Sequence, residues 1–362
     1  MRTYNYTEFI SSNVSGWAVR NSQYKLIEFE DGTQELYDVS IDLAEEDNLI
    51  LNGVGSYGDV IDLLAAYAAF IRGTAEPIIS MPNDGRQDIT NAILTANDAS
   101  CQQYAKSYMS TVTDIAENIM HEGSLEVLVE NDECVFLTNA IPSHNFNDGD
   151  QAFPNAVAAQ NDEYRITTHP QKASSPTALA LSVDNALLLN GVKVDLLAAA
   201  CFGVGNEKVG CNDIDQPWRF DPMFSANGFR VDSHNAHTQP DGTYHYHGAP
   251  NALFDDTSEL VVVGFAADGF PIFGSYFNDG NAIRKALSSY RLRSGDRPIG
   301  EGSPGGSYDG TFRDDYEYIA DSGDLDACNG MTVNGAYGYF VTDDYPYVMA
   351  CFTGTPHSSF NK

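Results

Sequence analysis

The chain has 362 residues, and its 51 acidic side chains against 19 basic ones give a formal net charge of −32. This charge argues against nucleic acid and anionic membrane surfaces as partners, because both are polyanions that bind Lys and Arg. It fits a solvated acidic surface that keeps a protein soluble, or a protein that binds cations. The length allows one large globular domain or two.

The first 75 residues show a small α+β pattern. Residues 16–39 alternate as two strands joined at a turn over 30–32, and residues 60–71 have helical apolar spacing. Their sequence resembles the C-terminal end of the sulfatase (alkaline-phosphatase superfamily) fold. The matching runs are Ala18-Val-Arg20, Tyr24-Lys-Leu-Ile27, Glu35-Leu-Tyr-Asp38 and Glu46-Asp-Asn-Leu49.

The catalytic half of a sulfatase is not in this sequence. No Cys/Ser-x-Pro-Ser-Arg motif, whose first residue becomes formylglycine in that family, occurs in the chain. The resemblance therefore implies a remnant of a sulfatase-like hydrolase, with an upstream catalytic domain in the parent protein and no sulfatase activity from this chain alone. Residues 76–97, with two prolines and Asp84-Gly85, are predicted to be a linker.

Residues 98–362 are predicted to form the second domain. Residues 98–120, 194–200 and 282–290 have helical character, whereas from Leu125 onward most apolar runs are short and separated by Gly, Pro, Asn and Asp. We therefore predict a mainly β fold, a disulfide-stapled sandwich-like or jelly-roll-like module with few short helices.

Six cysteines are present, and none has the CxxC spacing of zinc ribbons or redox sites. Sequence order suggests three local pairs, although six cysteines allow about fifteen connectivities. Disulfides imply an oxidising compartment, so we expect a secreted, extracellular or periplasmic protein. No apolar run approaches the length of a membrane span. The suggested pairs are Cys101–Cys134, Cys201–Cys211 and Cys328–Cys351.

A stretch of sixteen residues from Asp232 to His247 holds four of the eight histidines, His234, His237, His245 and His247. Thr243-Tyr-His-Tyr-His247 has the period of a strand, which places His245 and His247 on one face and the two tyrosines on the other. The turn at Pro240-Asp-Gly242 would fold the earlier histidines back toward this imidazole face. Converging neutral imidazoles suit copper or zinc, so the sequence predicts all four histidines as metal ligands.

Four motifs in order resemble the YHYH-domain family over roughly residues 100–362. The resemblance implies a bacterial protein of a commonly secreted family without a settled biochemical activity. It leaves the chemistry of the histidines open. The motifs are Asp241-Gly-Thr-Tyr-His-Tyr-His-Gly248, Gly264-Phe-Ala-Ala-Asp-Gly-Phe-Pro-Ile-Phe-Gly274, Leu325-Asp-Ala-Cys-Asn-Gly330 and Tyr345-Pro-Tyr347.

The first of these motifs recurs as Asn334-Gly-Ala-Tyr-Gly-Tyr-Phe340. The tyrosines persist while the histidines become Gly338 and Phe340, so histidine is not needed to build such a hairpin. The tyrosines are accordingly predicted to pack with wet hydroxyl ends, and His245 and His247 to be functional.

Several alternatives remain open at this stage. The imidazoles could form a structural hydrogen-bonded network, serve metal-free acid–base chemistry, or hold a metal in an oxidase or hydrolase. The module could also be a non-catalytic accessory domain that recognises a polysaccharide or another partner. Asp232 and Asp268 are expected to support the ligands, Asp268 otherwise capping a turn, and His144 is a further candidate ligand. No nucleophile-elbow motif supports a hydrolytic triad, and no catalytic residue is predicted.

Overall fold

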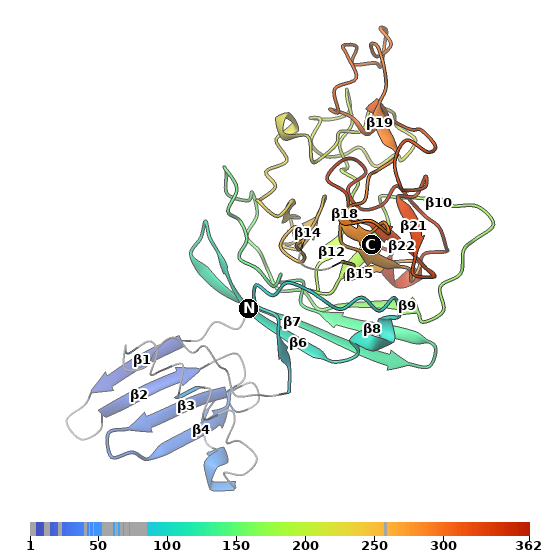
Figure 1. Cartoon of the computed structure of the whole chain (residues 1–362). Helices are drawn as coiled ribbons and strands as arrows, with labels where there is room; N and C mark the ends of the chain where they lie inside the picture. Colours follow the sequence, from blue (N-terminus) through green and yellow to red (C-terminus); the bar gives the residue numbers. More distant parts are fainter. Residues whose placement is uncertain are drawn as a thin grey trace. The chain divides into compact units, whose positions relative to one another are not determined.

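The computed structural model describes residues 5–10, 15–20, 24–39, 42, 44–45, 47–52, 61, 64–65, 68, 72, 85–256 and 259–362. The chain divides into two compact units, residues 1–86 and 87–362, and each is described here by itself (Figure 1). The boundary between them falls within the predicted linker. Residues 76–84 of that linker lie outside the described residues.

The first unit contains an antiparallel sheet in the order β1-β2-β3-β4. Residues 16–29, predicted as part of one strand, contribute to two strands, β2 and β3. Its core combines strand residues such as Leu26 and Leu36 with Leu64 and Ala68 from the predicted helical segment 60–71. Residues 61, 64, 65 and 68 are helical, and the rest of that segment lies outside the described residues. The strands are β1 (Asn5–Ile10), β2 (Ser15–Arg20), β3 (Tyr24–Phe29) and β4 (Gln34–Asp38), followed by the 3-10 helix η1 (Leu49–Asn52).

The second unit begins with a five-stranded sheet in the order β5-β6-β7-β8-β9. Its long hairpin β6–β7 pairs eight residues of each strand, from Ser107↔Glu126 to Asp114↔Ile119 (Figure 1). The strands are β5 (Gln87–Asp88), β6 (Ser107–Asp114), β7 (Ile119–Glu130), β8 (Glu133–Thr138) and β9 (Asp162–Thr167).

An eight-stranded sheet, called here the large sheet, follows in the order β13-β14-β12-β11-β15-β16-β22-β21. Two of its neighbouring pairs, β12–β14 and β16–β22, are parallel, and the others are antiparallel. The strands are β11 (Ala186–Leu188), β12 (Lys193–Val194), β13 (Ala236–Thr238), β14 (Tyr244–Tyr246), β15 (Val262–Ala266), β16 (Pro271–Phe273), β21 (Gly330–Val333) and β22 (Ala336–Phe340).

Short two-stranded ladders and 3-10 turns complete this unit. The ladders are β10 (Thr177–Ala178) with β23 (Cys351–Phe352), β17 (Tyr276–Asn278) with β18 (Ile283–Lys285), and β19 (Tyr290–Leu292) with β20 (Tyr316–Tyr318). The 3-10 helices are η3 (Cys101–Tyr104), η4 (Ser225–Asn227), η5 (Arg313–Asp315) and η6 (Ser358–Phe360).

One hydrophobic core joins the two larger sheets of this unit. Phe265 of the large sheet meets Phe136 of β8 at a ring-centroid distance of 6.2 Å and Tyr104 at 5.6 Å. The prediction of a mainly β, sandwich-like fold is thus confirmed. The three disulfides are those that sequence order suggested, Cys101–Cys134, Cys201–Cys211 and Cys328–Cys351. Among the described residues, no helix has the length and hydropathy needed to cross a membrane.

The helices predicted in the second domain are wrong. Residues 98–120 contain a 3-10 turn, strand β6 and the start of β7. Residues 195–200 are irregular after the end of β12, and residues 282–290 contain β18 and the start of β19. Backbone groups in these segments bond to distant residues instead of to the next turn. The Asp195 N–H donates to the Tyr246 carbonyl (2.9 Å), and the Ala286 N–H donates to the Ser275 carbonyl (2.8 Å). Such tertiary hydrogen bonds outweigh a weak local helical preference.

Candidate metal centre

The histidine-rich stretch folds as the hairpin β13–β14 at the edge of the large sheet. Its turn closes through a hydrogen bond from the Gly242 N–H to the Gln239 carbonyl (2.9 Å). Gly242 has φ +87°, and a Cβ there would lie 2.6 Å from the Cβ of Ala158, so the position requires glycine. The resulting register pairs His237 directly with His245, as the predicted turn required.

Three imidazoles converge on one face of this hairpin, and they are called here the three-histidine cluster (His237, His245 and His247). The Nε2 atom of His247 lies 3.0 Å from Nε2 of His245 and 3.1 Å from Nε2 of His237. His245 and His247 are buried, and His237 is partly buried. Four-coordinate zinc, with Zn–N bonds of about 2.0–2.1 Å, would hold such nitrogens about 3.3 Å apart. The two printed distances from His247 are close to that value, and the ligand atoms of all three residues lie within 4.8 Å of one another.

In two of the rings, the hydrogen bond made by Nδ1 determines whether Nε2 carries a proton. Nδ1 of His237 lies 2.6 Å from the Phe229 carbonyl oxygen, and Nδ1 of His245 lies 3.3 Å from the Thr243 carbonyl oxygen. A carbonyl oxygen only accepts hydrogen bonds, so both Nδ1 atoms are donors and both Nε2 atoms carry a free lone pair. His247 can donate from Nε2 to one of these neighbours at most. At least one of the two contacts near 3 Å therefore holds no proton between its nitrogens, and a bound cation would relieve it.

Burial lowers the pKa of all three imidazoles, and the neighbouring imidazoles lower the pKa of His245 and His247 further. The rings are therefore neutral at pH 7, the form in which histidine binds a metal. Nδ1 of His247 is buried and has no hydrogen-bond partner among the described residues.

His234, the fourth predicted ligand, lies apart from the cluster. Its ring packs on His144 at a centroid distance of 3.9 Å, and its Nε2 is 4.0 Å from an oxygen of Asp148. His144, the further candidate, donates from Nδ1 to the Asn145 carbonyl (2.8 Å), so its Nε2 accepts from the Tyr246 hydroxyl at 2.5 Å. Burial lowers the pKa of His144 to about 3. The structure thus brings together three of the four predicted ligands.

The tyrosines of the two related motifs are buried, and the expectation of wet hydroxyl ends is wrong. The Tyr244 hydroxyl donates to Asp232 (2.8 Å), and in the second motif the hydroxyl of Tyr339, which occupies the position of Tyr246, donates to Asp268 (2.6 Å). Both motifs therefore place a tyrosine hydroxyl on a buried carboxylate. Asp232 and Asp268, expected to support the histidines, bind these tyrosines instead. The groups that orient His237 and His245 are backbone carbonyls, which no sequence motif reveals.

A group of buried and partly buried charged side chains includes Lys193 of the neighbouring strand β12. Lys193 of β12 pairs in register with His245, and its Nζ lies 3.2 Å from Asp184. Lys362 forms ion pairs with Asp195 and, at 3.5 Å, with Asp184. Each carboxylate also keeps one buried oxygen without a hydrogen bond. Lys193 and Lys362 add to the positive field that lowers the pKa values of His245 and His247.

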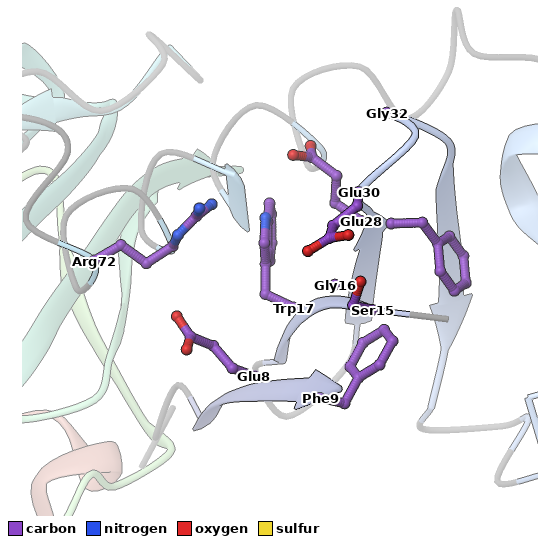
Figure 2. A pocket seen from close by; sticks show the side chains of 10 residues that line it. Glu8, Phe9, Ser15, Gly16, Trp17, Glu28, Glu30, Gly32 and Arg72 are labelled. Atoms are coloured by element: carbon purple, nitrogen blue, oxygen red, sulfur yellow. The ribbon is translucent and has the colours of Figure 1, made fainter. Parts of the chain in front are cut away.

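A separate pocket of about 400 Å³ lies in the first unit. Figure 2 shows Trp17 between Arg72 and the carboxylate of Glu28, with Glu8 and Glu30 also lining the pocket. Glu28 accepts a hydrogen bond from Gln34 (2.7 Å). The pocket contains none of the predicted site residues, and all four predicted ligands lie in the second unit.

Comparison with protein families gives one result that bears on the second unit. The model of the family described as YHYH protein matches residues 163–354. No curated protein matches the sequence. The family match is narrower than the span of roughly 100–362 suggested by the motifs. It does not reach residues 1–75, whose resemblance to a sulfatase remains a prediction.

The match includes the whole β13–β14 hairpin and therefore the three-histidine cluster. It covers more than half of the 362 residues. The chain belongs to the YHYH protein family.

Proposed function

We propose that this YHYH protein binds a divalent transition metal, copper or zinc, through His237, His245 and His247. The proposal rests on one observation above the others: the Nε2 atom of His247 lies 3.0 Å from that of His245 and 3.1 Å from that of His237, and all three imidazoles are neutral. Two of these rings are oriented by carbonyl acceptors on the opposite nitrogen, as is usual for metal-bound histidine.

The donor set favours copper or zinc over calcium or magnesium. Imidazole nitrogen suits zinc and copper, whereas the harder cations prefer oxygen ligands. Three imidazoles also leave at least one coordination position for water or another ligand, as in catalytic zinc sites. A bound zinc would act as a Lewis acid and a bound copper as a redox centre; the protein supplies the neutral, pre-oriented ligands.

The same proposal extends to the setting of the protein. Three disulfides support secretion or export to the periplasm. We also propose, from the resemblance of residues 1–75, that the module accompanies a sulfatase-like hydrolase. A purely accessory role in polysaccharide recognition gains less support, because Tyr244, Tyr246 and Tyr339 are buried and cannot stack on a sugar ring.

Elemental analysis of the protein purified without chelator tests metal binding. Near-stoichiometric copper or zinc is expected in the wild type and is expected to be lost in the double variant His245→Ala/His247→Ala. His169→Ala is the matched control, because His169 is exposed and outside the cluster. His234→Ala distinguishes the three-ligand site from the four-ligand site predicted from sequence. The variant should keep its metal if the site has three ligands and lose metal if His234 is a fourth ligand. Wild-type protein that stays metal-free when given copper or zinc would make the imidazoles a structural network.

A further inference from the structure

Three cationic side chains lower the pKa values of His245 and His247 through space, and one of them differs from the other two. Lys193 acts on His245, while Lys362 and Arg313 act on His247. Lys193 and Lys362 form ion pairs with Asp184 and Asp195. Arg313 forms no ion pair with any carboxylate in the described part of the chain. Arg313 therefore acts through space on His247 and on the Asp221 carboxylate without a close ion pair.

Arg313 lines a pocket of about 270 Å³ together with Arg219 and Asp314. The guanidinium of Arg313 donates to the Leu196 carbonyl (3.2 Å) and lies over the ring of Tyr345, 5.4 Å from its centroid. These contacts hold the side chain in place without neutralising it. A guanidinium fixed in this way is pre-organised for a planar anion.

Arg219 adds a second positive charge to the same pocket. It is 4% exposed, and its guanidinium donates to the carbonyls of Ala198 (2.7 Å), Cys211 (3.2 Å) and Asp213 (2.7 Å). Burial and the charge of Arg313 lower the pKa of Arg219. The one acidic residue of the lining, Asp314, accepts a hydrogen bond from the Arg219 backbone N–H (3.1 Å). Two guanidinium groups against one carboxylate leave the pocket positive in a chain of net charge −32.

Most other residues of the pocket lining are apolar, and one of them follows a segment that is hydrogen-bonded to the strand of the cluster. Leu179, Leu197 and Ile214 are part of its wall. Leu197 lies two residues after Asp195, whose N–H bonds to the carbonyl of Tyr246, between His245 and His247. The wall can therefore receive a short hydrocarbon chain at one side and an anionic group at Arg313.

We propose that this pocket binds a small organic carboxylate. Its anionic group would bind Arg313, near the second positive charge of Arg219. Its hydrocarbon part would pack against Leu179, Leu197 and Ile214. Guanidinium–carboxylate hydrogen bonds are charge-assisted and bidentate, which favours this group. The ligand would then lie beside the three-histidine cluster. Only this last statement rests on the proposed metal site; the pocket itself does not.

Calorimetric titration of the full chain with acetate, butyrate and sulfate tests the proposal. Butyrate is expected to bind more tightly than acetate, because its longer chain covers the apolar wall, and sulfate more weakly than butyrate. Arg313→Gln is expected to weaken butyrate binding by ~10-fold or more, the loss of a charged hydrogen-bonding partner. Arg165→Gln is the matched control, since Arg165 pairs with Glu130 and Glu163 outside the pocket. It is expected to leave binding unchanged.

Ile214→Ser gives a second variant, because Ile214 is 44% exposed and its replacement spares the fold. It is expected to remove the preference for butyrate over acetate. Absence of saturable butyrate binding, equal binding by wild type and Arg313→Gln, or equal binding of sulfate and butyrate would each overturn the proposal. Metal content measured on the same samples separates the two ideas. If the protein binds metal but does not bind butyrate, only the pocket proposal is refuted. If it binds butyrate but does not bind metal, only the metal-site proposal is refuted.

Discussion

At the scale of single residues, Tyr246 joins two buried polar side chains, His144 and Asn190. Its hydroxyl donates to Nε2 of His144 (2.5 Å) and accepts from Nδ2 of Asn190 (3.0 Å). Because its ring lies on the opposite face of β14 from His245 and His247, this network supports the hairpin without entering the cluster. Its role is to stabilise the strand that carries the ligands.

Tyr246→Phe is therefore expected to lower the free energy of unfolding by about 1–3 kcal/mol, because His144 and Asn190 lose a buried partner. Chemical denaturation measures the change. Tyr290→Phe is the matched control, since its hydroxyl bonds to the Ala327 carbonyl at an exposed position (2.7 Å), and it should cost about 1 kcal/mol or less. Metal content should be unchanged in both variants. Equal losses of stability would contradict the role given to Tyr246.

His144 also predicts how stability depends on pH. Burial lowers its pKa to about 3 in the folded chain, whereas an unfolded histidine titrates near 6.5. Between these values the unfolded state binds the proton and the folded state does not. The stabilisation is thus fully present above about pH 6.5 and is lost as the pH falls toward about 3.

In the presence of a chelator, the free energy of unfolding is expected to fall by several kcal/mol over this range. His144→Gln cannot titrate, so its loss over the same range should be smaller. The exposed His169→Gln should follow the wild type. Denaturation curves at several pH values compare the three proteins. An unchanged slope in His144→Gln would show that His144 does not contribute.

At the scale of elements, the β13–β14 hairpin could be predicted because the local signals agreed. The Pro240-Asp-Gly242 turn and the alternation of Tyr and His both specify it, and they place His237, His245 and His247 correctly. His234 lies outside the strand, at a position set by its packing on His144, a residue about ninety positions earlier. A contact over that distance has no local signal. The same reason explains the helices wrongly predicted over 194–200 and 282–290, whose backbone partners are also remote.

Gly242→Ala tests how far the hairpin turn determines the site. An alanine at φ +87° is strained, and its Cβ would also meet Ala158 at 2.6 Å and the Ala156 carbonyl at 2.9 Å. We expect a loss of about 2 kcal/mol or more in unfolding free energy, together with weaker metal binding. Gly280→Ala is the matched control, because Gly280 has φ +91° and nothing within 4 Å of the added atom. It should show only the backbone strain, about 1 kcal/mol, with wild-type metal affinity.

At the scale of the whole molecule, the chain keeps its cross-links and its candidate chemistry in one unit. All three disulfides, the core shared by the two larger sheets and the three-histidine cluster lie within residues 87–362. The smaller core of the first unit is separate. The order of the cysteines could predict the three disulfides, and the short apolar runs could predict the mainly β fold. Neither could predict the strand order of the large sheet, because pairs such as β16 with β22 join segments more than sixty residues apart.

Residues 87–362 are therefore expected to fold and bind metal without residues 1–86. The reason is physical: a unit with its own core and its own disulfides needs no contact from outside to offset the entropy of ordering its chain. The fragment, produced under oxidising conditions, should match the full chain in metal content and in the midpoint of its main thermal transition to within a few degrees. Reduction of its disulfides should lower that midpoint markedly, because cross-links of this kind each stabilise by about 2–4 kcal/mol. A fragment that aggregates, or that folds but fails to bind metal while the full chain binds it, would show that the first unit takes part in building the site.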